Sequence, residues 1–166
     1  PTLVVGIRAF NVHKDLAFKN KILWEFVEQG GTLIVQYNTS RGFDGNIAGP
    51  YPISFSRDRV TDEHATVTVL KPEHPIFNSP NEITSTDFEG WVQERSTYQA
   101  TAIDARYQAP LLMHDKNEQP SSGSLLTCAY GKGNFSYVSL ALFRQLPAGV
   151  AGSYKLLANL IALPKH

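Results

Sequence analysis

The sequence has few of the residues from which common catalytic and metal sites are built. Cys128 is the only cysteine, so an internal disulfide framework and a C-x-x-C zinc motif are both excluded. The five histidines form neither an H-x-H nor an H-x-x-x-H pair, and no G-x-S-x-G motif for a serine nucleophile is present. We therefore find no complete catalytic motif and expect neither a metal ion nor a cofactor.

Charge of one sign is not in excess either. Fifteen basic side chains balance fifteen acidic ones, which leaves no field to attract nucleic acid or an anionic membrane surface. No apolar run is long enough to span a bilayer. We expect no nucleic-acid partner and no membrane segment.

What the sequence does contain is the composition of one folded domain. Hydrophobic residues make up 42% and charged residues 18% of the 166 positions, which is typical of globular rather than disordered proteins. This length suits a single domain, residues 1–166. An apolar strand already begins at position 2, and a natural domain rarely begins on a buried parallel strand. We therefore expect the chain to be a fragment of a longer, multidomain protein.

Residues 2–38 carry the pattern of a strand–helix–strand unit. Residues 2–7 and 32–36 are short apolar runs without alternation, as in strands that are buried on both faces. Between them, apolar residues recur at three- and four-residue spacing over 15–29, which is typical of an amphipathic helix, and Gly30 is placed to end it. Strands joined in this way are parallel. We expect an α/β fold with a mostly parallel sheet flanked by helices.

The rest of the sequence predicts shorter strands, a hairpin and a closing helix. A turn-rich loop over 38–52 is followed by strands expected within 65–70, 88–95 and 111–114. Gly131-Lys132-Gly133 separates two apolar runs, 124–130 and 134–142, and glycines supply the positive φ angles that a tight turn needs. Apolar residues at helical spacing after Gly149 predict a C-terminal helix that closes the fold.

Polar side chains follow both strands of the strand–helix–strand unit. Arg8 and Asn11 come after the first strand, and Gln36, Tyr37 and Asn38 end the second. The carboxyl ends of parallel strands lie at one edge of the sheet, where open α/β folds bind ligands. Arginine, amide and aromatic groups together can hold a polar ligand such as a sugar or a carboxylate. The alternative is that Gln36 and Asn38 only satisfy backbone groups of the long loop.

Two further segments add candidate ligand-binding residues. Trp91, Glu94 and Arg95 could line a pocket, although a tryptophan is more often part of a core. Arg144 follows the last predicted strand of the hairpin and could face the same crevice as the other polar residues. These residues predict a binding site rather than a reaction.

The segment from residue 56 to residue 63 is dense in alternating charge. Arg57, Asp58, Arg59 and Asp62 favour an ion-pair network that fastens a loop, and the alternative is a ligand site that includes Arg57. Cys128 lies inside the predicted hairpin, where a free thiol is usually buried and structural.

Acid–base chemistry by carboxylates is a second possibility for function. Asp58, Asp62, Glu89 and Glu94 are candidates, but a glycosidase-type reaction needs two carboxylates at a defined separation, which the sequence alone does not give. A hydrolase that acts on a sugar derivative through Asp and Glu residues therefore stays open as an alternative.

Several stretches resemble a known family. The unit 3–38, the His74-Pro75-Ile76-Phe77 stretch and the hairpin with its closing helix resemble the class I glutamine amidotransferase-like fold, a flavodoxin-like arrangement. More closely, the chain resembles the C-terminal region of bacterial PIG-L (LmbE-like) deacetylase proteins, in residues 5–11, 30–38, 56–63, 90–95 and 143–149.

The resemblance implies an accessory domain rather than an enzyme. It implies an upstream catalytic domain in the same protein, a zinc-dependent N-acetylsugar deacetylase, and a bacterial protein that is periplasmic or secreted. Tyr37 and Asn38 stand where the amidotransferase nucleophile would lie, so we expect no activity in this domain. The expected function is therefore a non-catalytic domain that binds carbohydrate or packs on its catalytic partner. A purely structural or oligomerisation module is a further alternative.

Overall fold

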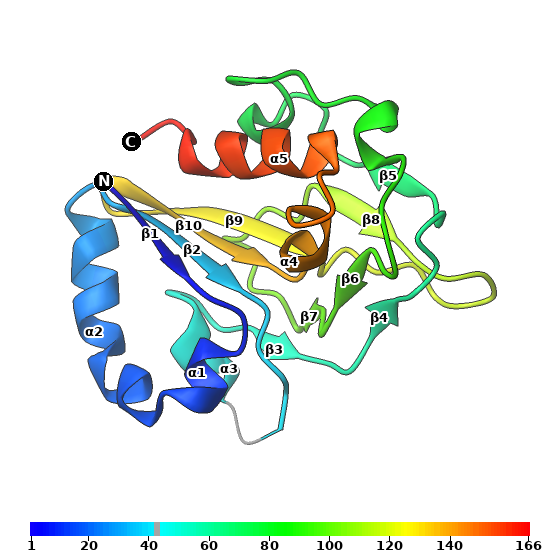
Figure 1. The fold of residues 1–166 in the computed structure, drawn as a ribbon. Helices are drawn as coiled ribbons and strands as arrows, with labels where there is room; N and C mark the ends of the chain where they lie inside the picture. Colours follow the sequence, from blue (N-terminus) through cyan, green and yellow to red (C-terminus); the bar gives the residue numbers. More distant parts are fainter. Residues whose placement is uncertain (42–43) are drawn as a thin grey trace.

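A four-stranded sheet forms the centre of the computed structural model, which describes residues 1–41 and 44–166 (Figure 1). The strand order is β1 (Thr2–Val5), β2 (Thr32–Gln36), β10 (Gly133–Val138) and β9 (Leu125–Tyr130). β1 and β10 both pair with β2 in parallel, and β9 pairs with β10 as an antiparallel hairpin. The chain is therefore a mixed α/β protein with a mostly parallel sheet.

Two helices cover the opposite faces of this sheet, α2 (Lys14–Glu28) on one and α5 (Ala151–Ile161) on the other (Figure 1). Successive residues of a strand point to opposite faces, so β2 contributes to two cores. Leu33 and Val35 belong to the core that includes Leu23 and Val27 of α2. Ile34 belongs to the core that includes Leu156 and Leu160 of α5. This two-sided burial explains the apolar run without alternation at 32–36.

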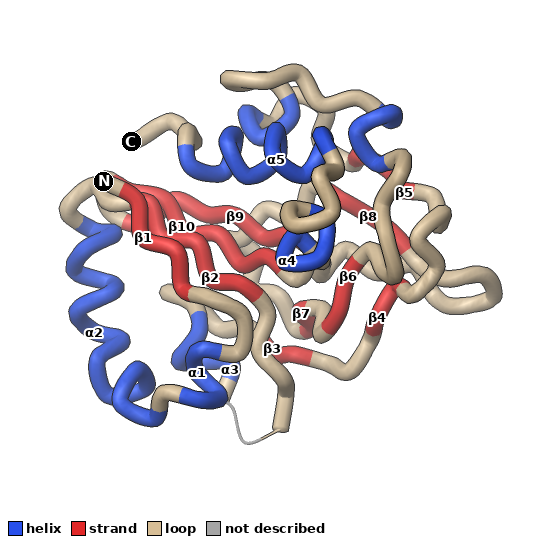
Figure 2. Tube along the Cα trace, in the orientation of Figure 1, coloured by secondary structure: helices blue, strands red, loops and turns tan. Residues whose placement is uncertain are grey.

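The segment between β2 and β9 is built from short elements, as the tube view shows (Figure 2). Three two-stranded pairs are β3 (Ser54–Phe55) with β7 (Ala100–Thr101), β4 (Arg59–Val60) with β6 (Ser96–Thr97), and β5 (Val67–Val69) with β8 (Leu111–Met113). The short helices of this segment are α3 (Gly45–Ala48), η1 (Pro75–Phe77) and η2 (Ser85–Phe88), while two more lie outside it, α1 (Ala9–Val12) before β2 and α4 (Leu142–Gln145) after β10. No helix in the described part of the chain is long and apolar enough to cross a membrane.

The expected strand–helix–strand unit, hairpin and closing helix are all confirmed. The prediction of a strand over 88–95 is wrong, because Phe88 ends η2 and the next strand, β6, begins at Ser96. The segment instead turns back on itself, with positive φ angles at Gly90 and Gln93. The predicted loop 38–52 contains the short helix α3, and its residues 42–43 lie outside the described residues. The flavodoxin-like subclass is not confirmed, since only β1, β2 and β10 are parallel to one another in the sheet described here.

Candidate functional site

The carboxyl ends of β1 and β2 meet, as the sequence predicts. Arg8 follows β1 in a left-handed conformation with φ 56°, and its backbone N–H donates to the Tyr37 carbonyl at 2.8 Å. A non-glycine residue in this conformation is strained and persists only where its surroundings hold it. The turn after β1 is thus fixed against the end of β2, which places Arg8 beside Tyr37.

The two asparagines at this edge are used by the backbone. Asn38 is fully buried, and its Oδ1 accepts from the Phe10 N–H at 3.0 Å while its Nδ2 donates to the Gln36 carbonyl at 3.0 Å. Asn11 exchanges two hydrogen bonds with the backbone of Thr39, at 3.1 and 2.8 Å. The contacts of Asn38 therefore agree with the alternative drawn from the sequence, in which its side-chain amide satisfies backbone groups.

Glu94 is a buried carboxylate held between two arginines. The residue is 3% exposed. Its Oε2 accepts from Arg59 Nε at 3.1 Å and Nη2 at 2.5 Å, and its Oε1 accepts from Arg144 Nε at 2.8 Å. Charge-assisted bonds of this kind are short and strong. Both carboxylate oxygens are therefore occupied by positively charged donors.

The backbone around Glu94 is held by α4. Gln145 is fully buried, and its side chain accepts from the Val92 N–H at 2.8 Å and donates to the carbonyls of Val92 and Glu94 at 3.0 and 3.2 Å. Gln93 between them has φ 67°. This clamp sets the direction in which Glu94 reaches Arg59 and Arg144.

Three aromatic rings lie next to the ion pairs. The Tyr37 and Tyr98 rings are stacked, with centroids 5.9 Å apart and planes at 5°. Tyr37 also contacts Phe143 at 5.2 Å, and the Arg144 guanidinium carbon lies 5.1 Å from the Phe143 centroid. Burial raises the pKa of Tyr37, Arg8 and Arg144 act to lower it, and Glu94 acts to raise it. We call this group the edge cluster; its members are Tyr37, Arg59, Glu94, Tyr98, Phe143 and Arg144.

Trp91 and Arg95, which the sequence grouped with Glu94, have other partners. Trp91 is 2% exposed, packs on Phe88 and donates its indole N–H to the Asp87 carbonyl at 3.1 Å. Arg95 is buried and donates to the carbonyls of Ala65 and Phe88. Burial lowers the pKa of Arg95. The core interpretation of Trp91 is confirmed, and Arg95 extends from the same core.

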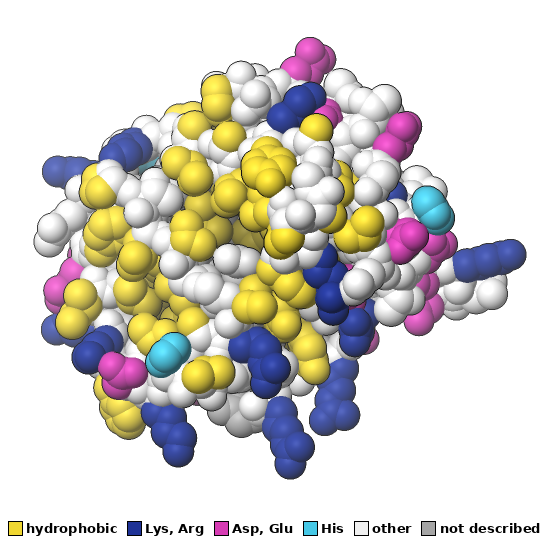
Figure 3. Space-filling view, in the orientation of Figure 1, with side chains coloured by type: hydrophobic (Ala, Val, Ile, Leu, Met, Phe, Trp, Pro, Cys, Tyr) yellow, Lys and Arg dark blue, Asp and Glu magenta, His cyan; other side chains and the backbone are white. Residues whose placement is uncertain are grey.

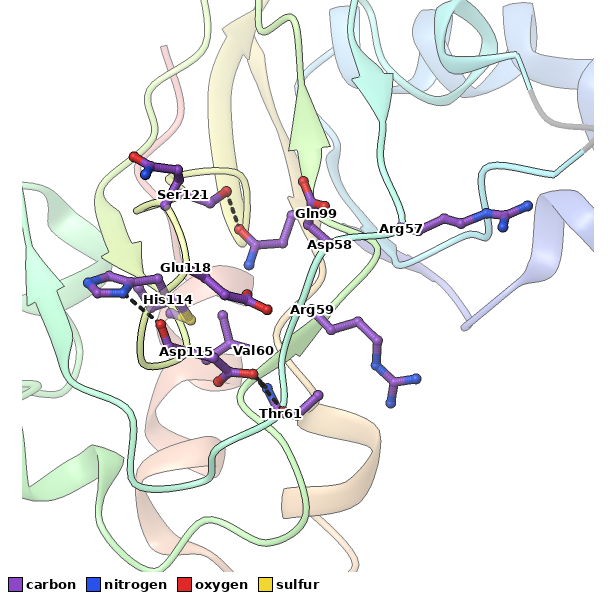
Figure 4. Close-up of a pocket in the computed structure, with 12 residues that line it drawn as sticks. Arg57, Asp58, Arg59, Val60, Thr61, Gln99, His114, Asp115, Glu118 and Ser121 are labelled. Carbon is purple, nitrogen blue, oxygen red and sulfur yellow. Dashed lines mark hydrogen bonds between the residues drawn. The ribbon is translucent and has the colours of Figure 1, made fainter.

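A polar groove of about 530 Å³ adjoins the edge cluster (Figure 4). Arg57–Thr61 form one wall, and Glu118 points between the walls. The rest of the lining comes from Gln99, Met113, His114, Asp115, Gln119 and Ser121. Asp115 accepts from the Thr61 N–H and hydroxyl at 2.8 and 2.6 Å. Burial acts to raise the pKa of Asp115, but these hydrogen bonds outweigh it and hold the pKa below its usual value. The groove therefore holds an ionised carboxylate in a fixed place.

Arg59 connects the groove to the edge cluster, and Arg57 stands at the rim. In Figure 4 both side chains point away from Asp115 and Thr61. The expected ion-pair network among Arg57, Asp58, Arg59 and Asp62 is wrong, because Arg59 pairs with Glu94 instead. In the part of the chain that the structure describes, Arg57 forms no ion pair.

The structure adds residues to the site that the sequence pattern did not identify. Tyr98 has φ 56° and stacks on Tyr37 from a segment 61 residues later in the chain. Phe143 directly precedes Arg144, which is the only local signal for it. Gln36 is half-buried at the end of β2. Pairing across such sequence distances depends on tertiary packing, which periodicity does not reveal.

Metal and thiol chemistry have little basis in the described residues. No group of three His, Cys, Asp or Glu side chains among residues 1–41 and 44–166 lies close enough together to hold a metal ion. Cys128 is buried, as expected, and burial raises the pKa of its thiol to about 12. A thiol with such a pKa is a poor nucleophile near neutral pH.

Comparison with known proteins gives structural likeness only. No protein-family model matches the chain, and no curated protein matches it. Among solved structures, a β-galactosidase from Rahnella sp. R3 is similar with a TM-score of 0.51 and 16% identity, over 98% of this chain and 22% of that one. A β-galactosidase from Bacillus circulans sp. alkalophilus is similar with a TM-score of 0.53 and 14% identity, over 97% and 22%. The chain thus spans about a fifth of the length of these enzymes, and the likeness shows a shared fold.

These findings correct the family resemblance drawn from the sequence. The two solved structures named above are β-galactosidases, and no family model supports a glutamine amidotransferase-like or PIG-L domain. The matched stretches of sequence are the two strand ends, the turn around Glu94 and the start of α4. Several of them surround this edge of the sheet, and the resemblance that they carried is not supported by these comparisons.

Proposed function

We propose that this chain is a non-catalytic accessory domain of a larger protein of the glycosidase type, and that it binds carbohydrate at the edge cluster. The fold likeness to β-galactosidases over about a fifth of their length supports a domain within a carbohydrate-active chain. The edge cluster supplies stacked tyrosines beside arginine donors, and such combinations of apolar surface with a few fixed polar groups are typical of small-ligand sites.

The occupied state of Glu94 is the observation that favours binding over catalysis. A general acid must hold a proton, and a nucleophile or base must present a free oxygen to the substrate. Both oxygens of Glu94 instead accept from arginines, from Arg59 and from Arg144. The carboxylate therefore positions the two guanidinium groups, whose partly exposed side chains lie beside the half-buried tyrosines.

No specific observation favours the hydrolase alternative, which stays a prediction. The pKa of Asp115 in the groove is lowered, the opposite of what a general acid needs. Of the carboxylates named for this alternative, only Glu94 pairs with arginine. In the described part of the chain, Asp58, Asp62 and Glu89 form no ion pair.

The proposal can be tested by combining binding and turnover measurements on the purified chain. Isothermal titration with methyl β-D-galactopyranoside is expected to show binding that Tyr98→Ala weakens, because that substitution removes half of the stacked pair. Tyr154→Ala, at a 52% exposed tyrosine on α5, is the matched control and should bind like the unmodified chain. The chain should release no nitrophenol from p-nitrophenyl β-D-galactoside. Equal affinity of the two variants, or turnover, would contradict the proposal.

A scaffold role is a second candidate, and an exposed apolar surface favours it. In the sheet formed by the described residues, β1 is an edge strand paired with β2, and Leu3, Val4 and Ile7 are 39–44% exposed. Val12, Phe18 and Ile22 nearby in sequence are more exposed still. Figure 3 shows hydrophobic side chains gathered on this face, which is hollowed between them. Edge strands with exposed apolar side chains favour pairing with another chain or segment.

Light scattering over a range of concentrations tests the scaffold role. Self-association that Val4→Lys abolishes would support it, because a lysine on the edge strand blocks pairing. A monomer at every concentration would count against self-association through β1. Binding at the edge cluster is measured independently of this result.

A further inference from the structure

Glu94 holds two arginines through only some of their N–H donors. Arg144 uses only its Nε on the carboxylate, and Arg59 uses Nε and Nη2. Among the described residues, no acceptor bonds to either Nη atom of Arg144 or to Nη1 of Arg59. The side chains are 36% and 47% exposed, so these donors reach the surface. Two guanidinium groups bound to one buried carboxylate are therefore held ready to bind a further acceptor.

The charge balance around the tyrosines is positive. Within the edge cluster, Arg59 and Arg144 contribute two positive charges and Glu94 contributes one negative charge, which leaves one positive charge in excess. The charged groups with the largest effects on the pKa of Tyr37 include Arg8 and Arg144, which act to lower it, and Glu94, which acts to raise it. In Figure 3, Lys and Arg side chains gather on the part of this face below α4. A protein with no net formal charge thus carries a local cationic surface beside the half-buried rings of Tyr37 and Tyr98.

We propose that the saccharide bound at the edge cluster is acidic, with its carboxylate on the free guanidinium ends of Arg59 and Arg144 and its ring against Tyr37 and Tyr98. This inference rests on the proposed function and names the ligand class for the same site. The fork of a guanidinium group matches the two oxygens of a carboxylate. A sulfate ester on a sugar offers the same kind of oxyanion, so the test compares the two sources.

The test uses two ligands that differ in one group. Methyl β-D-galactopyranosiduronate carries a carboxylate where methyl β-D-galactopyranoside carries a hydroxymethyl group. In a low-salt NMR titration of the full chain, the uronate is expected to bind about tenfold more tightly, as one charge-assisted bidentate contact would give. The difference should shrink with added sodium chloride because the arginines are partly exposed.

Variants at Arg144 separate ligand binding from a structural role. Arg144→Met should remove the preference for the uronate, and Arg144→Lys should restore part of it, since a lysine keeps the charge but not the fork. Arg106→Met is the control, because Arg106 pairs with Asp104 and stacks on Tyr51 outside the edge cluster. Thermal unfolding checks that each variant is folded, and if Arg144→Met does not fold, the salt dependence and Arg144→Lys still decide the question.

The results of these titrations distinguish the preference for an acidic sugar from the proposed carbohydrate site itself. A preference for the uronate that depends on Arg144 supports the inference. Equal binding of both galactosides overturns the acidic preference and leaves the proposed carbohydrate site standing. Sodium sulfate or methyl galactoside 6-sulfate binding more tightly than the uronate overturns the assignment to a carboxylate. Binding of neither galactoside overturns the proposed site and the inference together.

Discussion

Replacing Glu94 by glutamine tests whether the carboxylate organises the edge cluster. The substitution keeps the size and one acceptor oxygen but removes the charge that Arg59 and Arg144 share. Glu94→Gln should therefore leave two arginines near each other without the group that holds them. We expect a loss of stability together with a loss of order in both side chains.

The expected loss of stability depends on how deeply Glu94 and its two arginine partners are buried. Removing one partner of a fully buried ion pair costs about 3–5 kcal/mol, because a buried charge is left unpaired. Here the arginine side chains are 47% and 36% exposed, so water partly solvates the charges that remain. Hydrogen bonds to charged groups contribute about 1.5–3 kcal/mol. We expect Glu94→Gln to lower the free energy of unfolding by about 2 kcal/mol.

Urea unfolding followed by circular dichroism measures this loss. Asp15→Asn is the matched control, since the Asp15–Lys19 pair is exposed on α2 and should leave the unfolding midpoint nearly unchanged. A double-mutant cycle with Arg144→Met should give a coupling energy of about 1 kcal/mol or more. A loss for Glu94→Gln no larger than that for Asp15→Asn would refute the idea that Glu94 organises the site.

Three further predictions concern the core. Burial lowers the pKa of His74 below its ordinary 6.5. The unfolded chain therefore binds more protons than the folded chain, and the free energy of unfolding should fall as pH drops below 6.5. In urea titrations at several pH values, His74→Gln should make the free energy of unfolding depend less on pH. Gly152→Ala should lower the free energy of unfolding by about 1–3 kcal/mol, because a Cβ there would lie 1.8 Å from the Asp87 carbonyl oxygen. Gly6 has open space around it, so Gly6→Ala should lower the free energy of unfolding much less in the same assay. Cys128, whose pKa is raised to about 12 by burial, should react with a thiol reagent at pH 8 only after unfolding, and rapid reaction of the native chain would contradict its buried position.

The sequence predicts best where a pattern reflects burial. The apolar run at 32–36 is a strand buried on both faces, and the helical spacing in 15–29 marks α2, because each pattern records which side chains avoid water. The short apolar segment 88–95 misleads, since Phe88 and Trp91 are buried from a turn-rich loop rather than from a strand. The length of a short apolar segment alone does not distinguish a strand from a buried loop.

The sequence predicted only part of the candidate site, because several of its residues meet only through the packing of distant segments. Arg8 and Tyr37 lie together because parallel strands end at one edge, which topology alone implies. Arg59 and Arg144 meet at Glu94 from segments 35 and 50 residues away in the sequence. Those pairings depend on how the loops pack, and the charges of Arg59 and Glu94 in the sequence do not identify each other as partners.

Carbohydrate binding at the edge cluster can be observed residue by residue. The most direct test is a ¹H–¹⁵N NMR titration of the labelled chain with methyl β-D-galactopyranoside and then its uronate. We expect the amide signals that move to belong to residues 36–38, 93–98 and 143–145. No movement with either ligand, or movement confined to the groove at 113–121, would contradict it.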